Sequence, residues 1–365
     1  MRVLFHQNHT SLASVVEVVH LLAIVLNGLK VVHEPHELDE DAWRRFVLEN
    51  EKGNIFQTPE MYQVYLSTEG HEPIFTAILN KNQDIVATML GAYKEEAGSF
   101  ARRFSKRVLV SGGPIIADTA NRHALFDEII RAYTVQAKRN ALFTEVRNVL
   151  PSIEFQPNFE AAGYRYIPHV TTCLDLTPGT EELWNSLSSK RRQQIRKASK
   201  KGLTTCVVTI KDLDDLYALF EETYQRISFP VPRKSLFESV ISILQSKNLA
   251  RLIGVRHEER LVSVLVNLPY KDMIYAWYCA VTMEYARLHC NELMFWSAFE
   301  WGVENGFKLF DFGGGGSPEE AEDGVRVFKE RMGGMTRETG RYECVHAPLK
   351  YKLASLGFKV WRAIR

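Results

Sequence analysis

The residues best suited to chemistry lie around a run of four glycines near the C-terminal end of the chain. A short apolar stretch ends in Asp311-Phe312 and leads directly into these glycines, of which Gly313 and Gly314 come first. Because glycine has no Cβ, the backbone of such a turn can approach a ligand closely. The pattern indicates a strand that ends in a ligand-contacting loop.

An aromatic–lysine pair, Phe328-Lys329, opens a predicted helix shortly after the glycines. The lysine supplies positive charge where a ligand would contact the turn, so it is a candidate for stabilising negative charge during a reaction. Asp311 is a candidate proton acceptor for an attacking amine, but its place at the end of a strand favours a buried structural aspartate over that role. For the whole stretch, the alternative is a flexible loop before an ordinary amphipathic helix.

The most basic segment of the chain, residues 188–202, is predicted to be a connector helix. Leu187, Ile195 and Ala198 share one side of this helix, so the charges cover the opposite face. Such a face contacts phosphate groups or an RNA backbone, mainly at low salt, or it is simply solvated. The basic residues of the segment are Lys190, Arg191, Arg192, Arg196, Lys197, Lys200 and Lys201.

Several common catalytic motifs are absent from the sequence. It contains no G-x-x-x-x-G-K-[ST] phosphate loop, no H-E-x-x-H, no clustered metal-binding residues and no G-x-S-x-G nucleophile motif. His169, His289 and His346 are isolated, which is typical of structural histidines. We therefore expect no metal and no cofactor. The residues point to a cleft that positions two substrates and stabilises negative charge with lysine, arginine and backbone N–H groups.

The totals favour a globular protein of two domains. The 365 residues exceed what one compact core usually holds, and 45% apolar and 24% charged residues are typical of soluble proteins. The net charge is +1, so binding of a polyanion would depend on local patches. The five cysteines are scattered without a C-x-x-C, which favours a reducing cytoplasm. An apolar segment at 15–32 is interrupted by polar residues and is predicted to be a buried helix or a non-native leader.

The same order of elements is predicted twice along the chain: a strand, a turn, a helix and a second strand. In this comparison residues 142–145 correspond to residues 309–312. The repetition predicts one α/β unit used twice, with chemistry in the second copy because the first lacks the glycines. Within the second copy, the strand at 273–280 is rich in aromatic residues.

Alternation along that aromatic strand places Tyr275 and Trp277 on one face and Ala276 and Tyr278 on the other. Tyr278 is a candidate substrate contact. A last strand is predicted at 342–345, and a basic amphipathic helix follows at 350–365. This helix either docks on the first domain or makes a peripheral contact with an anionic membrane. The expected division is an extension at 1–28, a first domain at 29–180, a second domain at 181–346 and the returning helix at 347–365.

Three blocks of sequence, taken in this order, resemble the Fem (FemABX) family. The blocks are Ile55-Phe56-Gln57-Thr58-Pro59, residues 190–198 with Gly202, and residues 311–314 with residues 328–330 and Gly333. Members of this family have two tandem GNAT-like domains and transfer an amino acid from aminoacyl-tRNA to the stem peptide of a peptidoglycan precursor. The resemblance therefore implies an α/β (α+β) fold of two tandem GNAT-like domains, with mixed sheets flanked by helices.

The resemblance also assigns roles to single residues. It implies that Phe328 and Lys329 handle the aminoacyl end of the donor and that Arg226 contacts substrate phosphate. A lysine that the family carries in the first domain would fall near Tyr65, where this chain has none. The long coiled-coil arm of some members and the G-x-G loop of acetyl-CoA-binding relatives are also missing. These departures weaken the expectation of a UDP-linked peptidoglycan acceptor and of ordinary acetyl transfer.

The expected activity is amide-forming acyl transfer from aminoacyl-tRNA, or another polyanionic acyl donor, to an amine on a cell-envelope precursor. Such an enzyme is expected in the cytoplasm or at the inner face of the membrane. The first alternative is an N-acyltransferase of exopolysaccharide synthesis that uses acyl-CoA or acyl carrier protein. The second is a non-catalytic RNA-binding module in which the basic helix matters most.

Overall fold

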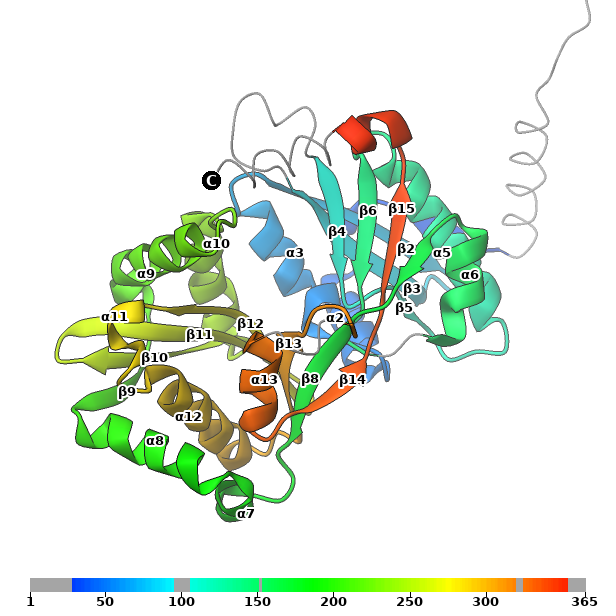
Figure 1. The fold of residues 1–365 in the computed structure, drawn as a ribbon. Helices are drawn as coiled ribbons and strands as arrows, with labels where there is room; N and C mark the ends of the chain where they lie inside the picture. Colours follow the sequence, from blue (N-terminus) through cyan, green and yellow to red (C-terminus); the bar gives the residue numbers. More distant parts are fainter. Residues whose placement is uncertain (1–27, 95–105, 151–152, 320–323, 354–365) are drawn as a thin grey trace, which may run out of the picture.

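The computed structural model describes residues 28–94, 106–150, 153–319 and 324–353. Two mixed sheets, each flanked by helices, make up the two halves of the molecule (Figure 1). The first sheet comprises β1 (Lys30–Val32), β2 (His71–Leu79), β3 (Ile85–Lys94), β4 (Arg107–Ser111), β5 (Ile115–Ile116), β6 (Phe143–Arg147), β7 (Arg165–Ile167) and β15 (Arg341–Val345). The second comprises β8 (Val170–Asp175), β9 (Leu203–Val207), β10 (Arg251–His257), β11 (Arg260–Tyr270), β12 (Met273–Val281), β13 (Leu309–Gly314) and β14 (Met335–Glu338).

The helices divide between the two halves in chain order. The first half contains α2 (Glu40–Glu49), α3 (Pro59–Leu66), α5 (Arg122–Ala137) and α6 (Gln156–Ala161), with the short turns η1 (Pro35–Glu37), η2 (Ile55–Gln57) and η3 (Ile153–Phe155). The second contains α7 (Thr180–Ser186), α8 (Ser189–Lys200), α9 (Leu213–Arg226), α10 (Lys234–Ser239), α11 (Met283–Ala286), α12 (Cys290–Glu304) and α13 (Gly324–Arg331), with η4 (Ile210–Asp212), η5 (Val240–Leu244) and η6 (Gln245–Lys247).

The two sheets have the same strand arrangement. The first runs β1-β2-β3-β4-β6-β15-β7, and the second, from its other edge, runs β9-β10-β11-β12-β13-β8-β14. Each has one parallel pair, β4 with β6 and β12 with β13, joined through a long helix, α5 or α12. The repeated order of elements predicted from the sequence is thus also a repeated topology.

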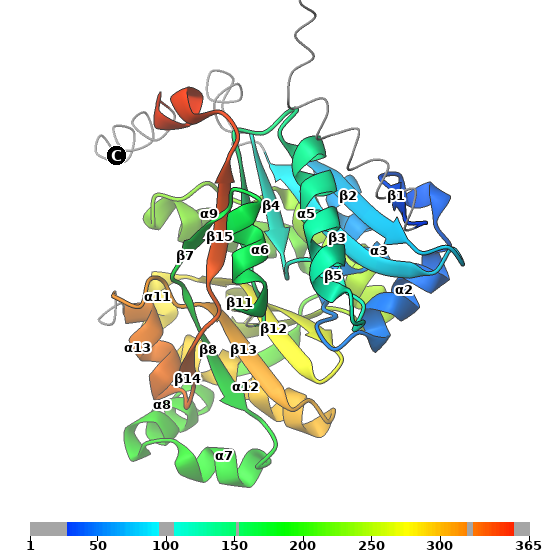
Figure 2. The same ribbon diagram turned by 90° about the vertical axis from the view of Figure 1, so that its right-hand side faces the viewer.

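One strand of each half lies in the sheet of the other half. β8 leaves the first half and pairs antiparallel with β13 and β14, while β15, at the other end of the described chain, pairs antiparallel with β6 and β7. Figure 2 shows the two crossing connections. The expected boundary between 180 and 181 is therefore wrong for β8. The strand predicted at 342–345 exists as β15, but it completes the first sheet and not the second.

Three hydrophobic clusters hold the layers together. One lies between the first sheet and α5 and α6, and a second lies between the second sheet and α7, α8 and α12. The third joins the halves, since Phe56 and Val64 of the first half share it with Phe220 and Leu244 of the second. The two halves consequently have a common core.

A bulge alters the aromatic strand β12. Val266 pairs with Tyr278 and the next residue, Asn267, pairs with Ala276, so Trp277 has no partner opposite it. The extra residue shifts the alternation, and Tyr275, Trp277 and Tyr278 all border the shared core. The prediction that Tyr278 lies on the face opposite Tyr275 is wrong for this reason.

The ends of the chain fall largely outside the described residues. The extension at 1–28 is described only from residue 28 onward, and the C-terminal helix at 350–365 is described to residue 353. Tyr351, in that described turn, packs edge-on against Phe143 and donates a hydrogen bond of 2.9 Å to Glu343 of the first sheet. No described helix is long and apolar enough to cross a membrane.

Candidate functional site

The glycine turn at the end of β13 is held by buried side chains. Asp311 is 1% exposed, and its Oδ1 accepts hydrogen bonds from the Thr171 hydroxyl at 2.5 Å and from the Gly313 N–H at 2.8 Å. Lys329 Nζ donates to the carbonyl oxygens of Gly313 and Gly314 at 2.9 and 2.7 Å. The turn is therefore a fixed structure, and the sequence alternative of a flexible loop does not apply to its start.

A second cation extends this fixation along the turn. The buried Arg326 donates through Nε and Nη2 to the carbonyl of Gly315, at 3.0 and 2.6 Å, and also to the carbonyls of Ser317 and Pro318. The φ of Gly313 is +75°, and a Cβ there would lie 3.0 Å from the carbonyl oxygen of Ala276. Both the backbone angle and the contact explain why glycine occupies this position.

Burial changes the acidity of Asp311. Burial raises its pKa to about 6, against lowering contributions from the Thr171 and Gly313 hydrogen bonds and from the charge of Lys329. A carboxylate with this pKa is mostly ionised at neutral pH and takes up a proton more readily than an exposed aspartate. Its neighbours on β13, Phe310 and Phe312, belong to the core on the other side of the sheet. Alternation therefore directs Asp311 toward the face that looks at the first half.

The first sheet presents a polar face to the same space. Along β6, Thr144 and Val146 are fully buried, whereas Glu145 and Arg147 are only partly buried. Arg341 of the adjacent strand β15 joins them. Arg147 Nε and Arg341 Nη1 donate to Glu145 Oε1 at 2.8 and 3.1 Å, and Arg341 Nη2 lies 2.8 Å from His169 Nε2. Burial lowers the pKa of His169 to about 4, so the neutral ring accepts this bond at pH 7.

This polar face has more positive than negative charge. Lys94 of β3 and Arg107 of β4 are cross-strand partners, and the charges of Arg107 and Arg147 both act on Lys94. Burial, followed by the charges of Arg147 and Arg107, lowers the pKa of Lys94 to about 7. The other acid on this face, Glu343, already bonds to Arg165 and Tyr351. Among the described residues, Glu145 is the carboxylate that bonds to both Arg147 and Arg341, and Lys94 lies near the same charges, an arrangement that favours an anionic ligand.

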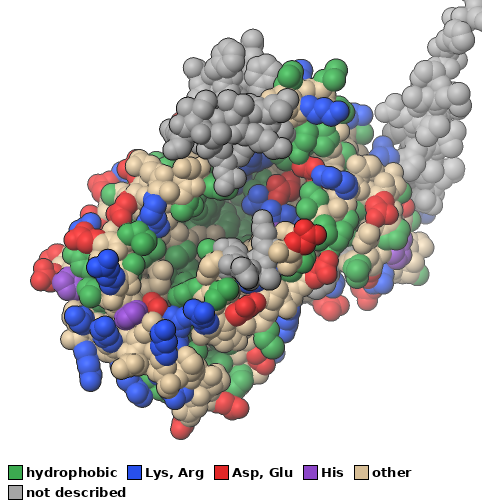
Figure 3. Space-filling model, viewed as in Figure 1, with side chains coloured by type: hydrophobic (Ala, Val, Ile, Leu, Met, Phe, Trp, Pro, Cys, Tyr) green, Lys and Arg blue, Asp and Glu red, His purple; other side chains and the backbone are tan. Residues whose placement is uncertain are grey.

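The two faces border one hollow. Figure 3 shows it between α10 and β12 on one side and β4 and β6 on the other, with hydrophobic side chains at its floor. A substituted Cβ at Gly314 would lie 2.9 Å from His169 Nε2 and 3.5 Å from Arg341 Nη2, so the glycine turn touches the polar face of the first sheet. We call this space, bordered by the turn and by the polar face, the cleft.

Aromatic side chains line the cleft on the side of the second sheet. Tyr275 and Trp277 pack edge-on against Phe56, with centroids 5.1 and 5.7 Å apart, and the Tyr275 hydroxyl lies 3.8 Å from a Cβ placed on Gly313. Tyr278 packs edge-on against Phe237, and Arg147 lowers its pKa while burial raises it more strongly. The structure thus brings Tyr278, a predicted substrate contact, to the cleft.

The first block of the family resemblance has a structural task. Gln57 is fully buried; its Nε2 donates to the carbonyls of Leu90 and Ser111, and its Oε1 accepts from the Leu90 N–H. The bonds clamp η2 to β3 and to the end of β4 beside the cleft. Thr58 caps α3 by accepting from the Met61 N–H, and Pro59 occupies the first turn.

The basic helix α8 divides its charges between interior and surface, contrary to the expectation of one uniform basic face. Arg191 is buried, forms a 2.6 Å ion pair with Glu292 and lies over the Phe328 ring. Arg192 donates to the carbonyls of Asn185 and Leu187, and Arg196 lies over the Trp184 ring. The residues of the segment that stay exposed without such contacts are Lys190, Lys197, Lys200 and Lys201.

Two other predicted residues lie apart from the glycine turn's polar contacts. The Phe328 ring packs on Phe295 and Arg191 at the edge of the second-sheet core. Arg226, at the end of α9, is exposed and donates to the carbonyl of Val281 at 3.2 Å. Among the described residues, no group of three or more histidine, cysteine or acidic side chains could hold a metal ion.

Sequence reasoning missed the basic side of the cleft. Lys94, Arg107, Arg147 and Arg341 come from four strands. The pairing of β3, β4 and β6 brings the first three together, and the pairing of β15 with β6 adds Arg341. A usable signal existed in Phe143-Thr144-Glu145-Val146-Arg147, where strict alternation places two charges on one face of a half-buried strand. Two charged side chains on one face of a strand, opposite a face that packs in the core, indicate that no helix covers the charged face.

The second sheet differs from the first at the site. The parallel ladder of β12 with β13 covers only residues 273–275 and 309–311, although both strands continue further. In the first sheet, by contrast, β4 stays paired with β6 through residue 111. The two strands of the second sheet therefore diverge beside Asp311 and the glycine turn.

Comparison with known proteins supports the fold. Residues 189–321 match the family model described as an acetyltransferase (GNAT) domain, and no curated protein sequence matches significantly. The crystal structure of FemX is similar with a TM-score of 0.66 and 16% identity, over 89% of this chain and 99% of that one. A tandem GNAT protein from the clavulanic acid biosynthesis pathway is similar with a TM-score of 0.57 and 12% identity, over 87% and 98%.

A third structure extends the comparison to a different named protein. The C-terminal domain of a putative lysylphosphatidylglycerol synthetase from Agrobacterium fabrum has a TM-score of 0.56 and 14% identity, over 90% of this chain and 97% of that one. These likenesses confirm the predicted architecture of two tandem GNAT-like domains with mixed sheets flanked by helices. Together with the match of residues 189–321 to an acetyltransferase (GNAT) domain, they support an acyltransferase.

Proposed function

We propose an amide-forming reaction for this chain, whose residues 189–321 match a GNAT acetyltransferase domain and whose tandem fold is similar to that of FemX. The observation that carries the proposal is Asp311, a buried carboxylate with its pKa raised to about 6, at the start of a rigid glycine turn. This group faces a cleft whose opposite wall is basic. The arrangement suits removal of a proton from an amine on an anionic acceptor.

In the proposed reaction the acceptor amine attacks the carbonyl carbon of an activated acyl donor. A C–N bond forms, and the carbonyl π electrons move to oxygen to give a tetrahedral intermediate. The amine proton passes to the Asp311 carboxylate. The intermediate then collapses to the amide, the bond to the leaving oxygen or sulfur breaks, and the leaving group takes the proton.

Lys329 has a supporting role in this proposal. Its Nζ is bound to the carbonyls of Gly313 and Gly314, so it fixes the turn. Its charge also lowers the pKa of Asp311, against the dominant effect of burial, and keeps that group ionised at neutral pH. We therefore assign Lys329 to positioning the turn and tuning Asp311, in addition to the stabilisation of negative charge that the resemblance implies. Phe328 supports Lys329 by packing α13 against α12.

The acceptor is proposed to carry an anionic group next to its amine. Glu145 is the described carboxylate that bonds to both Arg147 and Arg341, and Lys94 adds a further positive charge beside Arg147. Nε of Arg341 is buried without a hydrogen-bond partner among the described residues. A phosphate or carboxylate of the acceptor would supply the missing charge and acceptor atoms. A precursor of the cell envelope fits this description.

The donor is proposed to enter where β12 and β13 diverge. The divergence leaves strand edges beside Asp311 that an extended acyl group can follow. For a polyanionic donor such as aminoacyl-tRNA, the exposed lysines of α8 provide surface charge. An acyl-CoA or acyl carrier protein is the second candidate donor, and the match of residues 189–321 to an acetyltransferase domain favours it.

A donor and acceptor panel tests this proposal. The purified chain is incubated with radiolabelled aminoacyl-tRNA or acyl-CoA and with amine acceptors that either carry or lack a phosphate. We expect transfer from one donor class, with a preference for the anionic acceptor of about tenfold or more. Transfer to none of the amines from either donor would overturn the proposal, and equal use of charged and neutral acceptors would overturn the role of the basic wall.

A further inference from the structure

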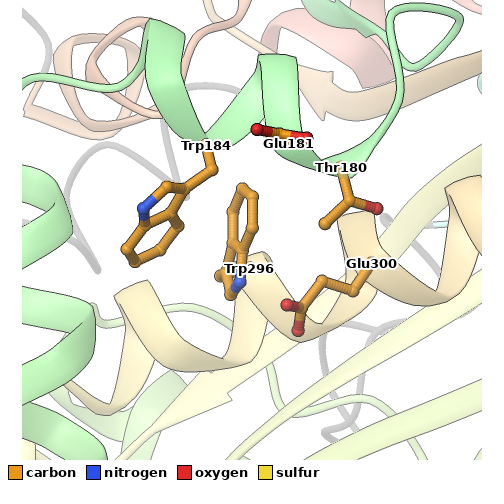
Figure 4. Close-up of a pocket in the computed structure, with 5 residues that line it drawn as sticks. All are labelled: Thr180, Glu181, Trp184, Trp296 and Glu300. Atoms are coloured by element: carbon orange, nitrogen blue, oxygen red, sulfur yellow. The ribbon is translucent and has the colours of Figure 1, made fainter.

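A second pocket lies on the opposite side of the second sheet from the cleft. It is formed where α7 packs on α12, and it has a volume of about 400 Å³. Figure 4 shows the side chains that line it. They are Thr180, Glu181, Trp184, Trp296 and Glu300. Its size is within the range of small-molecule sites, and its position separates it from acyl transfer.

Two indole rings form the apolar part of this pocket. Trp184 of α7 and Trp296 of α12 meet at an angle of 62° with centroids 4.8 Å apart, and Trp296 is mostly buried. The guanidinium of Arg196, which does not line the pocket, lies 5.1 Å from the centroid of the Trp184 ring. This contact shows that the Trp184 ring already takes part in one cation–π interaction, at a position outside the pocket.

Two carboxylates form the polar part. Neither Glu181 nor Glu300 forms an ion pair among the described residues, and no lysine or arginine lines the pocket. Burial raises the pKa of Glu300, the Trp296 indole counteracts this by hydrogen bonding, and Glu304 adds to the increase. Glu300 thus has a hydrogen-bond donor in Trp296 but no ion-pair partner among the described residues, and a cationic ligand would supply that counter-charge.

We propose that this pocket binds a small molecule that carries a primary or quaternary alkylammonium group. The cation would lie against the indole rings, where the negative faces of the aromatic systems attract it, and it would neutralise Glu300 and Glu181. An anionic ligand is excluded because both charged groups in the pocket are acidic. A neutral sugar could stack on an indole ring but would leave the two carboxylates without a counter-charge.

Binding of choline by the full chain, followed by tryptophan fluorescence and by calorimetry, tests the proposal. The comparison ligand is 3,3-dimethylbutan-1-ol, which has the shape of choline without its charge, and glucose represents the sugar alternative. We expect choline to bind about tenfold tighter than the neutral alcohol, as a cation–aromatic contact with added charge pairing predicts. Glucose should not bind.

Variants assign the binding to this pocket. Glu300→Gln should weaken choline binding at least about threefold, and Trp184→Leu should weaken it further. Glu181→Gln, at an exposed position, provides the same test if Glu300→Gln does not fold. The matched control is Glu182→Gln, since Glu182 is the next residue of α7 and does not line the pocket.

Each result decides the proposal. Selective choline binding that falls in the Glu300 and Trp184 variants but not in the Glu182 variant supports it. Equal binding of the neutral alcohol, preferential binding of glucose, binding that the pocket variants do not change, or no binding of any probe would overturn it. None of these results depends on acyl transfer, so they are independent of the function proposed for the cleft.

Discussion

At the scale of single residues, the site depends on charges that the fold has taken out of water. Asp311 is buried with two hydrogen bonds, yet its pKa rises because desolvation outweighs them. Across the cleft, Lys94 loses basicity for the same reason and because Arg147 and Arg107 are near. A carboxylate that readily accepts a proton and a wall that favours an anion are the two chemical properties of the cleft.

Replacing Asp311 tests the first property. Asp311→Asn should lower kcat by about 10²-fold or more, because asparagine accepts the same hydrogen bonds but is no base. In the wild type, kcat should fall as the pH drops through about 6, where Asp311 becomes protonated. The asparagine variant should lack this acidic limb. The pH profile is measured at a saturating acceptor concentration, so that titration of Lys94, which affects acceptor binding, does not interfere. If the variant kept the same acidic limb, that limb would belong to a group other than Asp311.

Replacing Arg147 tests the second property. Arg147→Gln removes a cation from the cleft and should raise KM for an anionic acceptor about tenfold or more, with a small effect on kcat. The control is Arg165→Gln, since Arg165 is 75% exposed and pairs with Glu343. Steady-state kinetics with acceptors that carry or lack the anionic group provide the measurement. If the KM values of the charged and the neutral acceptor changed equally, Arg147 would not be binding the anionic group of the acceptor.

At the scale of elements, α8 shows why a run of basic residues cannot be interpreted as one surface. The helix has Ile195 and Ala198 on its buried side, as its spacing predicts. Arg191 nevertheless lies inside, because α12 supplies Glu292 as its partner and α13 supplies Phe328. The exposed lysines remain as the part of the helix that can contact a polyanion.

This division predicts different effects for two substitutions of α8. Arg191→Gln should destabilise the protein by about 1–3 kcal/mol, because it removes the 2.6 Å ion pair with the mostly buried Glu292, which then keeps only His289, at 3.6 Å, among the described residues. The double variant Lys197→Gln/Lys200→Gln should change stability by less than about 0.5 kcal/mol each, since both side chains are exposed. Urea unfolding measures both. In an RNA-binding assay the lysine variant should show a smaller salt slope, and an unchanged slope would remove α8 from the donor site.

The elements near the site also show what local sequence can predict. The strand that carries Asp311 and its glycine turn is visible in the sequence, as apolar residues followed by Gly313 and Gly314. The Trp277 bulge is not, because it follows from the pairing of β12 with β11 and not from the residues of β12 alone. That single extra residue brings Tyr278 to the face of Tyr275 and so changes the aromatic wall of the cleft.

At the scale of the whole molecule, the exchanged strands β8 and β15 make the two halves depend on each other. Each strand sits between two strands of the opposite half, and a shared core lies between the sheets. The order of elements predicted the repeat, but the exchange was not predictable from it. A strand at 342–345 has the same local pattern whichever sheet it joins, so only long-range pairing decides its place and hence the position of Arg341.

The exchange predicts that the halves do not unfold separately. Thermal and urea unfolding, followed by circular dichroism and tryptophan fluorescence, should give coincident single transitions. A protease site inserted at Pro178-Gly179, between β8 and α7, should yield two pieces that stay together in size-exclusion chromatography. The intact chain with the uncleaved insertion is the control. Two transitions, or pieces that separate under native conditions, would contradict an interdependent pair of halves.

The central claim is that an acyl group passes to an amine in the cleft between the sheets. The most direct test is the chemical nature of the bond formed in a single turnover with a labelled donor and an anionic acceptor that offers both an amine and a hydroxyl. Treatment of the product with hydroxylamine cleaves esters and thioesters but leaves amides intact. We predict a label that resists hydroxylamine and is absent with Asp311→Asn in the same time. A label that hydroxylamine releases, or a resistant label that forms equally fast with Asp311→Asn, would contradict the account.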